Sequence, residues 1–147
     1  MDKLKDLFLD DDHFTTFFDY LDRLPTKCQN DKEYQSLLYL LSSNEEIVNH
    51  INDIYDFNER IIFPYEFATY SWQTGGSIRT TALAYNLYNG NKANGLPEDH
   101  PKHNDKGYSV SDLFDYGNVS LFLNAIAIRY GEIPINYVNE DFLKIID

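Results

Sequence analysis

The 147-residue sequence contains one cysteine, one methionine and one tryptophan, and only half as many basic residues as acidic ones. The single Cys28 excludes an internal disulfide framework and any zinc or iron–sulfur site built from several cysteines. With 12 Lys and Arg against 24 Asp and Glu, the net charge is −12, and direct binding to nucleic acid or an anionic membrane is disfavoured. No stretch approaches the roughly 20 consecutive apolar residues that span a bilayer, and the charged N-terminus does not resemble a signal sequence. We therefore expect a cytoplasmic protein.

The residues that are present predict a folded chain. Hydrophobic residues make up 43% of the sequence and aromatic residues 16%, which is enough apolar area to form a core without metals or disulfides. The length favours one acidic globular domain over residues 1–147. Residues 1–60 hold 14 acidic and 6 basic side chains, whereas residues 61–108 hold 4 of each. We expect the negative potential to come from the two ends of the sequence, because residues 109–147 are again acidic.

Five segments repeat apolar residues with the period of an α-helix, so the fold is predicted to be mostly α, a bundle of about five helices. The predicted helices cover residues 12–24, 31–41, 44–56, 78–89 and 119–130. Their expected N-caps are the Asp10–Asp12 run, Asn30, Ser43, Ser77 and Asn118. The second and third are separated by a very short connection, which favours an antiparallel hairpin. In the fifth, the predicted core stripe consists of Val119, Phe122, Leu123, Ile126 and Tyr130.

Other segments do not follow the helical period. Residues 60–72 are rich in β-branched and aromatic side chains around Pro64, which predicts a short β-strand or an irregular aromatic segment. Residues 91–107 are polar and contain several Gly and Pro residues, which is typical of a loop. Asn139 is placed to cap a last helical piece that docks back through Phe142, Leu143 and Ile146.

Four blocks of the sequence resemble one family of small proteins. They are Tyr39–Asn44, Ile54–Phe57, the pair Trp72–Ser77 and Leu83–Gly90, and Asn124–Tyr130. Together they are similar to an uncharacterised domain-of-unknown-function family of low-GC Gram-positive bacteria and their phages. The resemblance spans residues 30–131, and it implies a phage or mobile-element gene but no particular activity.

One segment has the features of an anion site. Gly75 and Gly76 let the backbone approach a ligand closely, and they precede a predicted helix whose free N–H groups favour anions. Thr74, Ser77 and Arg79 can add donors to a phosphate or carboxylate. The Lys and the spacing of a P-loop are missing, so the segment does not indicate nucleotide hydrolysis of that type. The simpler interpretation is a tight turn with Ser77 as the cap.

Metal and nucleophile patterns are weak. His100, His103, Asp99 and Asp105 offer donor atoms for a metal, but their spacing is more typical of an exposed polar loop. The Asp10–Asp12 run is explained by helix capping. Cys28 has no nucleophile motif around it, and no Ser/His/Asp order is visible. We expect no catalytic residues, no metal and no cofactor.

The tyrosines and carboxylates together favour a protein partner. Twelve tyrosines are more than a core of this size is expected to hide, so several should be exposed. The candidates are Tyr65, Tyr70, Tyr85, Tyr88, Tyr108, Tyr116 and Tyr137. We predict a non-enzymatic interaction protein that binds a basic, nucleic-acid-binding partner through Asp10, Asp11, Asp12, Tyr65, Tyr70 and Tyr116, as an inhibitor or nucleic-acid mimic. The alternatives are a small-ligand or anion-binding domain, with or without enzymatic activity, at residues 74–79, and a homodimer formed by exposed aromatics.

Overall fold

The structure is a computed structural model, and it describes residues 4–63, 70–89, 99, 109–115 and 118–138. It is mostly helical, as the sequence predicts, with one small antiparallel sheet in the described part. The α-helices are α1 (Asp11–Asp22), α2 (Lys32–Leu41), α3 (Glu45–Asn49), α4 (Ile51–Ile54), α5 (Gly75–Asn89), α6 (Val110–Phe114) and α7 (Val119–Arg129). Two 3-10 turns, η1 (Lys5–Leu7) and η2 (Thr26–Cys28), and the strands β1 (Tyr55–Asp56) and β2 (Ile61–Ile62) complete the described elements.

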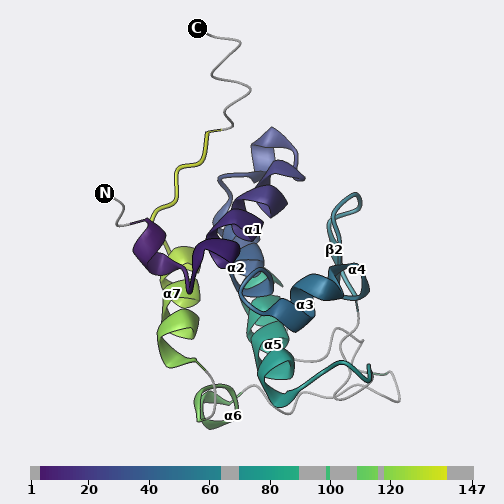
Figure 1. Ribbon diagram of the computed structural model, residues 1–147. Coiled ribbons are helices and arrows are strands. Elements are labelled where there is room, and N and C mark those ends of the chain that lie inside the picture. The colour runs from purple at the N-terminus through teal and green to yellow at the C-terminus, as the bar shows by residue number, and fades with distance from the viewer. Residues whose placement is uncertain (1–3, 64–69, 90–98, 100–108, 116–117, 139–147) are drawn as a thin grey trace, which may run out of the picture.

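Helix α2 lies at the centre of the molecule and packs mainly against α5 and α7, with α1 on another side (Figure 1). Every residue from Gln35 to Ser42 is buried, so this helix has no solvent face along most of its length. The predicted antiparallel pairing of the second helix with the third is wrong, because the main packing partners of α2 are α5, α7 and α1 rather than α3. The consecutive Leu and Tyr side chains of α2 are buried on all sides of the helix, whereas a single apolar stripe would leave one side exposed to solvent.

The predicted helix over residues 44–56 is interrupted at His50 and ends two residues earlier than predicted, at Ile54. The chain leaves helical geometry at His50, resumes one turn as α4, and then becomes β1. Tyr55 pairs with Ile62 and Asp56 with Ile61, so the short strand predicted near residues 60–72 is confirmed at Ile61 and Ile62. A turn stabilises this hairpin, because the Asp56 carboxylate accepts hydrogen bonds from two backbone N–H groups of the following residues.

Several predicted caps are displaced by one to three residues. Asp10 caps α1 and Asn118 caps α7, as expected. Helix α2 is capped by Asp31 rather than by Asn30, and α3 by Asn44 rather than by Ser43. Asn30 instead binds the backbone of Tyr137, with its amide oxygen accepting and its amide nitrogen donating. The physical reason is that adjacent capping side chains compete, and tertiary contacts decide which one faces the helix.

The described tyrosines lie mostly inside the fold, which corrects the exposure predicted from the sequence. Tyr85 is fully buried, and its hydroxyl donates to the carbonyl oxygen of Ile54 at 2.9 Å. Tyr70, Tyr88 and Tyr137 are half-buried, whereas Tyr65, Tyr108 and Tyr116 lie outside the described residues. The hydroxyls of Tyr39, Tyr85 and Tyr88 donate to backbone carbonyl oxygens, which compensates their desolvation. The Tyr20 hydroxyl, by contrast, is buried without a hydrogen-bond partner among the described residues.

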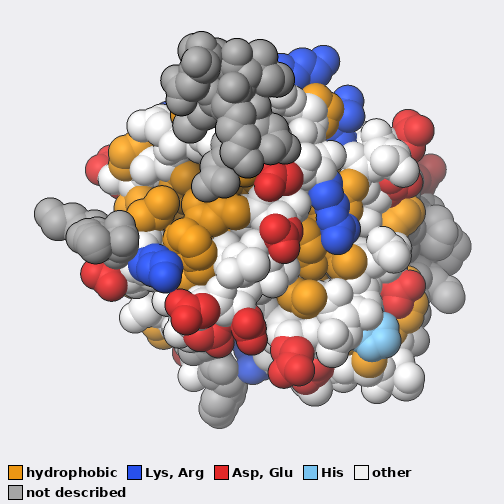
Figure 2. Space-filling view, turned by 45° about the horizontal axis from the view of Figure 1, so that its top comes forward, with side chains coloured by type: hydrophobic (Ala, Val, Ile, Leu, Met, Phe, Trp, Pro, Cys, Tyr) orange, Lys and Arg blue, Asp and Glu red, His pale blue; other side chains and the backbone are white. Residues whose placement is uncertain are grey.

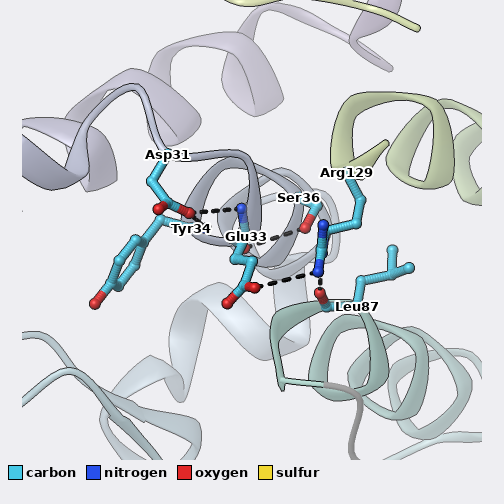
Figure 3. A network of polar contacts seen from close by, with 6 residues as sticks. All are labelled: Asp31, Glu33, Tyr34, Ser36, Leu87 and Arg129. Atoms are coloured by element: carbon cyan, nitrogen blue, oxygen red, sulfur yellow. Dashed lines mark hydrogen bonds and ion pairs between the residues drawn. The ribbon is translucent and has the colours of Figure 1, made fainter. Parts of the chain in front are cut away.

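Helix α7 is held to the rest of the bundle by Arg129 (Figure 3). The Nε atom of Arg129 donates to the carbonyl oxygen of Leu87 in the last turn of α5, at 2.7 Å, and its Nη2 atom lies 3.2 Å from Glu33 Oε1 of α2. The segment after α7 returns along α2, where Gln35 donates to the carbonyl oxygen of Ile135. None of the helices in the described ranges is long and apolar enough to cross a membrane.

The buried face of α7 differs from the predicted stripe. Leu121, Phe122, Ala125 and Ile128 face the core, while Val119, Leu123 and Tyr130 are exposed and Ile126 is only partly buried. Of the predicted stripe, Phe122 alone is fully buried. The prediction failed because α7 carries apolar residues on every side, so periodicity could not choose the face. The predicted helical piece after Asn139 lies outside the described residues.

Candidate functional site

An acidic recess lies between the beginning of α1 and the beginning of α3, with a volume of about 290 Å³. Asp10, the N-cap of α1, and Asp12, in its first turn, each contribute a carboxylate, and Glu45 contributes one from α3. The sequence folds this way locally because Asp10 and Asn44 each cap a helix, which places acidic residues in both first turns. The remaining lining residues are His13, Thr16, Ser42, Ser43 and Val48.

His13 lies at the inner wall of the acidic recess and is only 2% exposed. Its Nδ1 atom accepts a hydrogen bond from the Leu9 backbone N–H at 3.1 Å, and its Nε2 atom lies 2.8 Å from the carbonyl oxygen of Tyr39. These two contacts require a proton on Nε2 and none on Nδ1, which is the neutral imidazole. Burial lowers the pKa of His13, although the Tyr39 carbonyl and Asp10 oppose this effect. His13 therefore adds no positive charge to the recess at neutral pH.

The charge of the acidic recess is not compensated by its described lining residues, which include no Lys or Arg. The neighbouring Asp11 is paired with Lys5 at 3.8 Å, outside the recess. On the face drawn in Figure 2, carboxylate side chains are more widespread than Lys and Arg side chains and gather along its lower part. Among the described residues, His, Cys, Asp and Glu side chains form no group of three or more that could hold a metal ion.

The glycine-rich segment proves to be the first turn of α5, three residues earlier than predicted. Thr74, rather than Ser77, is the N-cap: its hydroxyl accepts from the Ser77 N–H at 3.3 Å, and the Ser77 hydroxyl accepts from the Thr74 N–H at 2.9 Å. Arg79 folds back over the turn, so that a Cβ atom at Gly75 would lie 3.1 Å from its Nη1 atom. Thr74, Gly75 and Gly76 are exposed, and Ser77 is buried.

A second recess, of about 210 Å³, lies beside this turn. It is bounded by Gly76 and Thr80 of α5 and by Asn118, the N-cap of α7. Sequence reasoning identified Gly76 but missed Asn118 as its neighbour, because no local pattern reports that two helices begin side by side. The Thr80 hydroxyl is already used, since it donates to the carbonyl oxygen of Gly76 at 2.8 Å.

Of the predicted partner-binding residues, the structure describes Asp10, Asp11, Asp12 and Tyr70, and Tyr70 is not among the described lining residues of the recess that contains Asp10 and Asp12. Asp10, Asp11 and Asp12 are exposed at the beginning of α1. Tyr70 is half-buried and stacks on Trp72, whose ring stacks in turn on His50 at a centroid distance of 4.5 Å. Tyr65 and Tyr116 lie outside the described residues. What sequence reasoning missed is Glu45, which completes the acidic recess from another helix.

A third and larger recess, of about 560 Å³, was not predicted either. It lies beside the β1–β2 hairpin and is lined by Arg23, Asn52, Tyr55, Asp56, Phe57, Asn58 and Phe63. The guanidinium of Arg23 lies over the ring of Phe57, with 5.0 Å between its Cζ atom and the ring centroid. No sequence motif indicates this arrangement, because its residues come from separate elements.

Comparison with known proteins gives one family. Residues 3–141 match DUF6075, which is described as a family of unknown function. The chain belongs to this family. The match supports the resemblance to an uncharacterised domain family that the four sequence blocks indicated. No curated protein and no solved structure matches the chain.

Proposed function

We propose that this DUF6075 protein is a non-enzymatic interaction protein that binds a basic protein partner through the acidic recess. The observation that carries the proposal is the recess itself, in which Asp10, Asp12 and Glu45 line one concavity with no Lys or Arg among its described lining residues. An Arg or Lys side chain of a partner supplies the missing charge, and Arg also matches carboxylates with a planar fork of donors.

The proposal no longer rests on exposed tyrosines, since the described ones are mostly buried or half-buried. It rests on three carboxylates that line one recess, of which Asp10 is held in place by capping α1. A pre-organised acidic surface loses little side-chain entropy when a cation docks, and it accelerates encounter with a basic partner. Binding of this kind weakens as salt rises, because the charges are at the surface.

The narrower role that we propose is inhibition. A protein with a net charge of −12 competes with nucleic acid for the basic surface of a nucleic-acid-binding protein. A cytoplasmic location and a phage or mobile-element origin belong to this proposal. The supporting experiment is displacement of labelled DNA from a basic DNA-binding protein, which should occur at low salt and diminish as salt is added.

The decisive experiment for the recess uses a short fluorescein-labelled oligo-arginine peptide and fluorescence anisotropy. The double variant Asp12→Asn with Glu45→Gln should bind about tenfold more weakly than the wild type, because two charge-assisted contacts are lost. The matched control is Asp112→Asn with Glu132→Gln, which removes the same charge from exposed sites outside the recess. Equal weakening of both double variants would show that only overall charge matters and would overturn the recess as the binding site.

A second candidate function is anion binding at the beginning of α5. The observation that favours it is the 210 Å³ recess in which the first turn of α5 meets the N-cap of α7, two helix N-termini that both favour negative charge. Under this function, inorganic phosphate should raise the melting temperature of the wild type by mass action. Arg79→Ala, which removes the guanidinium beside Gly75 in the same turn, should reduce the increase. Phosphate that leaves the melting temperature unchanged would exclude this function.

A further inference from the structure

The outward face of α7 is apolar, although the protein as a whole is acidic. Val119, Leu123 and Tyr130 are 46%, 53% and 66% exposed, and Ile126 is partly buried beside them. Apolar residues on all sides of a helix are typical of a helix that is covered on all sides. Because α2 and α5 cover only the inner face, the outer face of α7 lacks a cover among the described residues.

The spacing of these four side chains is that of a coiled-coil seam. The intervals from Val119 to Leu123, Ile126 and Tyr130 are four, three and four residues, which keeps one narrow stripe aligned along a helix. The order of these intervals is the same when the stripe is read from its N-terminal or its C-terminal end. An antiparallel copy of α7 therefore places Val119 opposite Tyr130 and Leu123 opposite Ile126, so that the surface is complementary to itself, as a twofold interface requires.

The lack of acidic residues on this face indicates which kind of partner fits it. The segment 118–131 contains no Asp or Glu, although the chain has 24 of them. A basic partner would find nothing to pair with here, whereas a second equally acidic copy can approach without carboxylates meeting across the seam. The one charged side chain of α7, Arg129, is already committed to Glu33 and to the Leu87 carbonyl oxygen. Its guanidinium also lies 5.0 Å from the centroid of the Tyr130 ring.

We propose that the outer face of α7, formed by Val119, Leu123, Ile126 and Tyr130, is a homodimer surface on which two copies pack antiparallel about a twofold axis. In this arrangement the two helix dipoles are antiparallel, so the positive end of each helix lies beside the negative end of the other. A seam of four side chains per copy is short compared with a standard interface of roughly 800 Å² per partner, so the dimer is weak and in exchange with the monomer. This surface is distinct from the acidic recess, whose lining residues all precede α4 in the chain.

The first test is sedimentation of the full chain over a range of concentrations from about 1 to about 300 µM. The mass should rise from 17.2 kDa toward twice this value with concentration. Leu123→Glu, which places carboxylates across the seam, should remain a monomer throughout. The matched control is Ile61→Glu, because Ile61 is 52% exposed and lies on the β1–β2 hairpin, away from α7 (Figure 1). A wild type that stays monomeric, or a dimer that persists in Leu123→Glu, would overturn the proposal.

The second test fixes the orientation by cross-linking under a mild oxidant, oxidised glutathione. Leu123→Cys and Ile126→Cys chains, one of them carrying a mass tag, are mixed and oxidised. Antiparallel packing predicts that mixed disulfides exceed both kinds of identical pair by severalfold, and a parallel pair predicts the reverse. The unmodified chain is the control, because its Cys28 is buried and should not cross-link. Predominance of identical pairs would overturn the antiparallel arrangement.

Discussion

The Nε2 atom of His13 and the carbonyl oxygen of Tyr39 lie 2.8 Å apart across the contact between α1 and α2. Tyr39 is itself completely buried, and its hydroxyl donates to the Leu7 carbonyl oxygen and accepts from the Asn124 amide. This pair therefore links the N-terminal turn, the central helix and α7. Because His13 also lines the acidic recess, the same contact fixes the wall of the candidate site.

The first prediction concerns stability and pH. The pKa of His13 is lowered below its ordinary value of 6.5 by burial, so the unfolded chain takes up this proton more readily than the folded one. The contribution of His13 to the free energy of unfolding is fully present above pH 6.5 and is lost as the pH falls toward the lowered pKa of the folded state. Urea unfolding should show the free energy of unfolding decreasing from about pH 7.5 to about pH 5.5.

The matched variants separate His13 from the carboxylates. His13→Gln should be less stable at neutral pH, because it leaves the Tyr39 carbonyl oxygen and the Leu9 N–H without their imidazole partners. Its stability should also decrease less over this pH range. His50→Gln, at a half-buried position outside the acidic recess, is the matched histidine variant for comparison. A His13→Gln variant with the pH dependence of the wild type would contradict the assignment of the stability decrease to His13.

The second prediction concerns the end of α7. Gly131 has a φ of +83°, and it ends the helix as the sequence predicts. Gly131→Ala should lower the free energy of unfolding by about 1–2 kcal/mol, since a Cβ atom is strained in this conformation. The added methyl would also lie 2.7 Å from Lys32 Nζ, which is flexible and can move away. Chemical denaturation measures the change, and a variant as stable as the wild type would contradict the strained geometry.

The third prediction has the opposite sign. Gly76 lies in the first turn of α5, and a Cβ atom there would meet only the Thr74 hydroxyl, at an ordinary 3.8 Å. Gly76→Ala should therefore raise the free energy of unfolding by about 0.5–1 kcal/mol, because alanine restricts the unfolded chain and favours the helix. A loss of stability would show that this turn is not the regular first turn of α5. The same denaturation series measures both glycine variants.

The fourth prediction separates the two contacts of Arg129. Arg129→Met keeps the aliphatic stem but removes the donor to the Leu87 carbonyl oxygen, and it should cost about 1–3 kcal/mol. Glu33→Gln removes only the partly exposed ion pair and should cost about 0–1 kcal/mol. Thermal or urea unfolding of both variants measures the difference. Equal costs would mean that the ion pair, rather than the bond to α5, holds α7 in place.

Local features of the fold were predictable from the sequence, and global ones were not. The helical class, the caps Asp10 and Asn118 and the stop at Gly131 follow from short-range rules that need no tertiary information. The central position of α2 does not follow from such rules, because a run of consecutive apolar residues does not show which other elements pack around the helix. The break at His50 escaped prediction for a similar reason, since His50 stacks on Trp72, which is distant in the sequence.

The candidate site was predictable only in part. The acidic run at Asp10 was identified from charge, but Glu45 reaches the same recess from α3, a tertiary arrangement that no motif encodes. The tyrosine prediction failed at Tyr85 because its hydroxyl finds the Ile54 carbonyl oxygen inside the core. Charge patterns thus located one wall of the recess, and tertiary contacts supplied the other.

The most direct measurement of the central claim is an NMR titration of the isotope-labelled protein with the oligo-arginine peptide. The account predicts saturable amide shifts concentrated at residues of the acidic recess, such as Thr16, Ser43 and Glu45, with amides around Asp112 unchanged. Shifts distributed over all exposed carboxylates in proportion to their charge, or shifts that miss the recess, would contradict it.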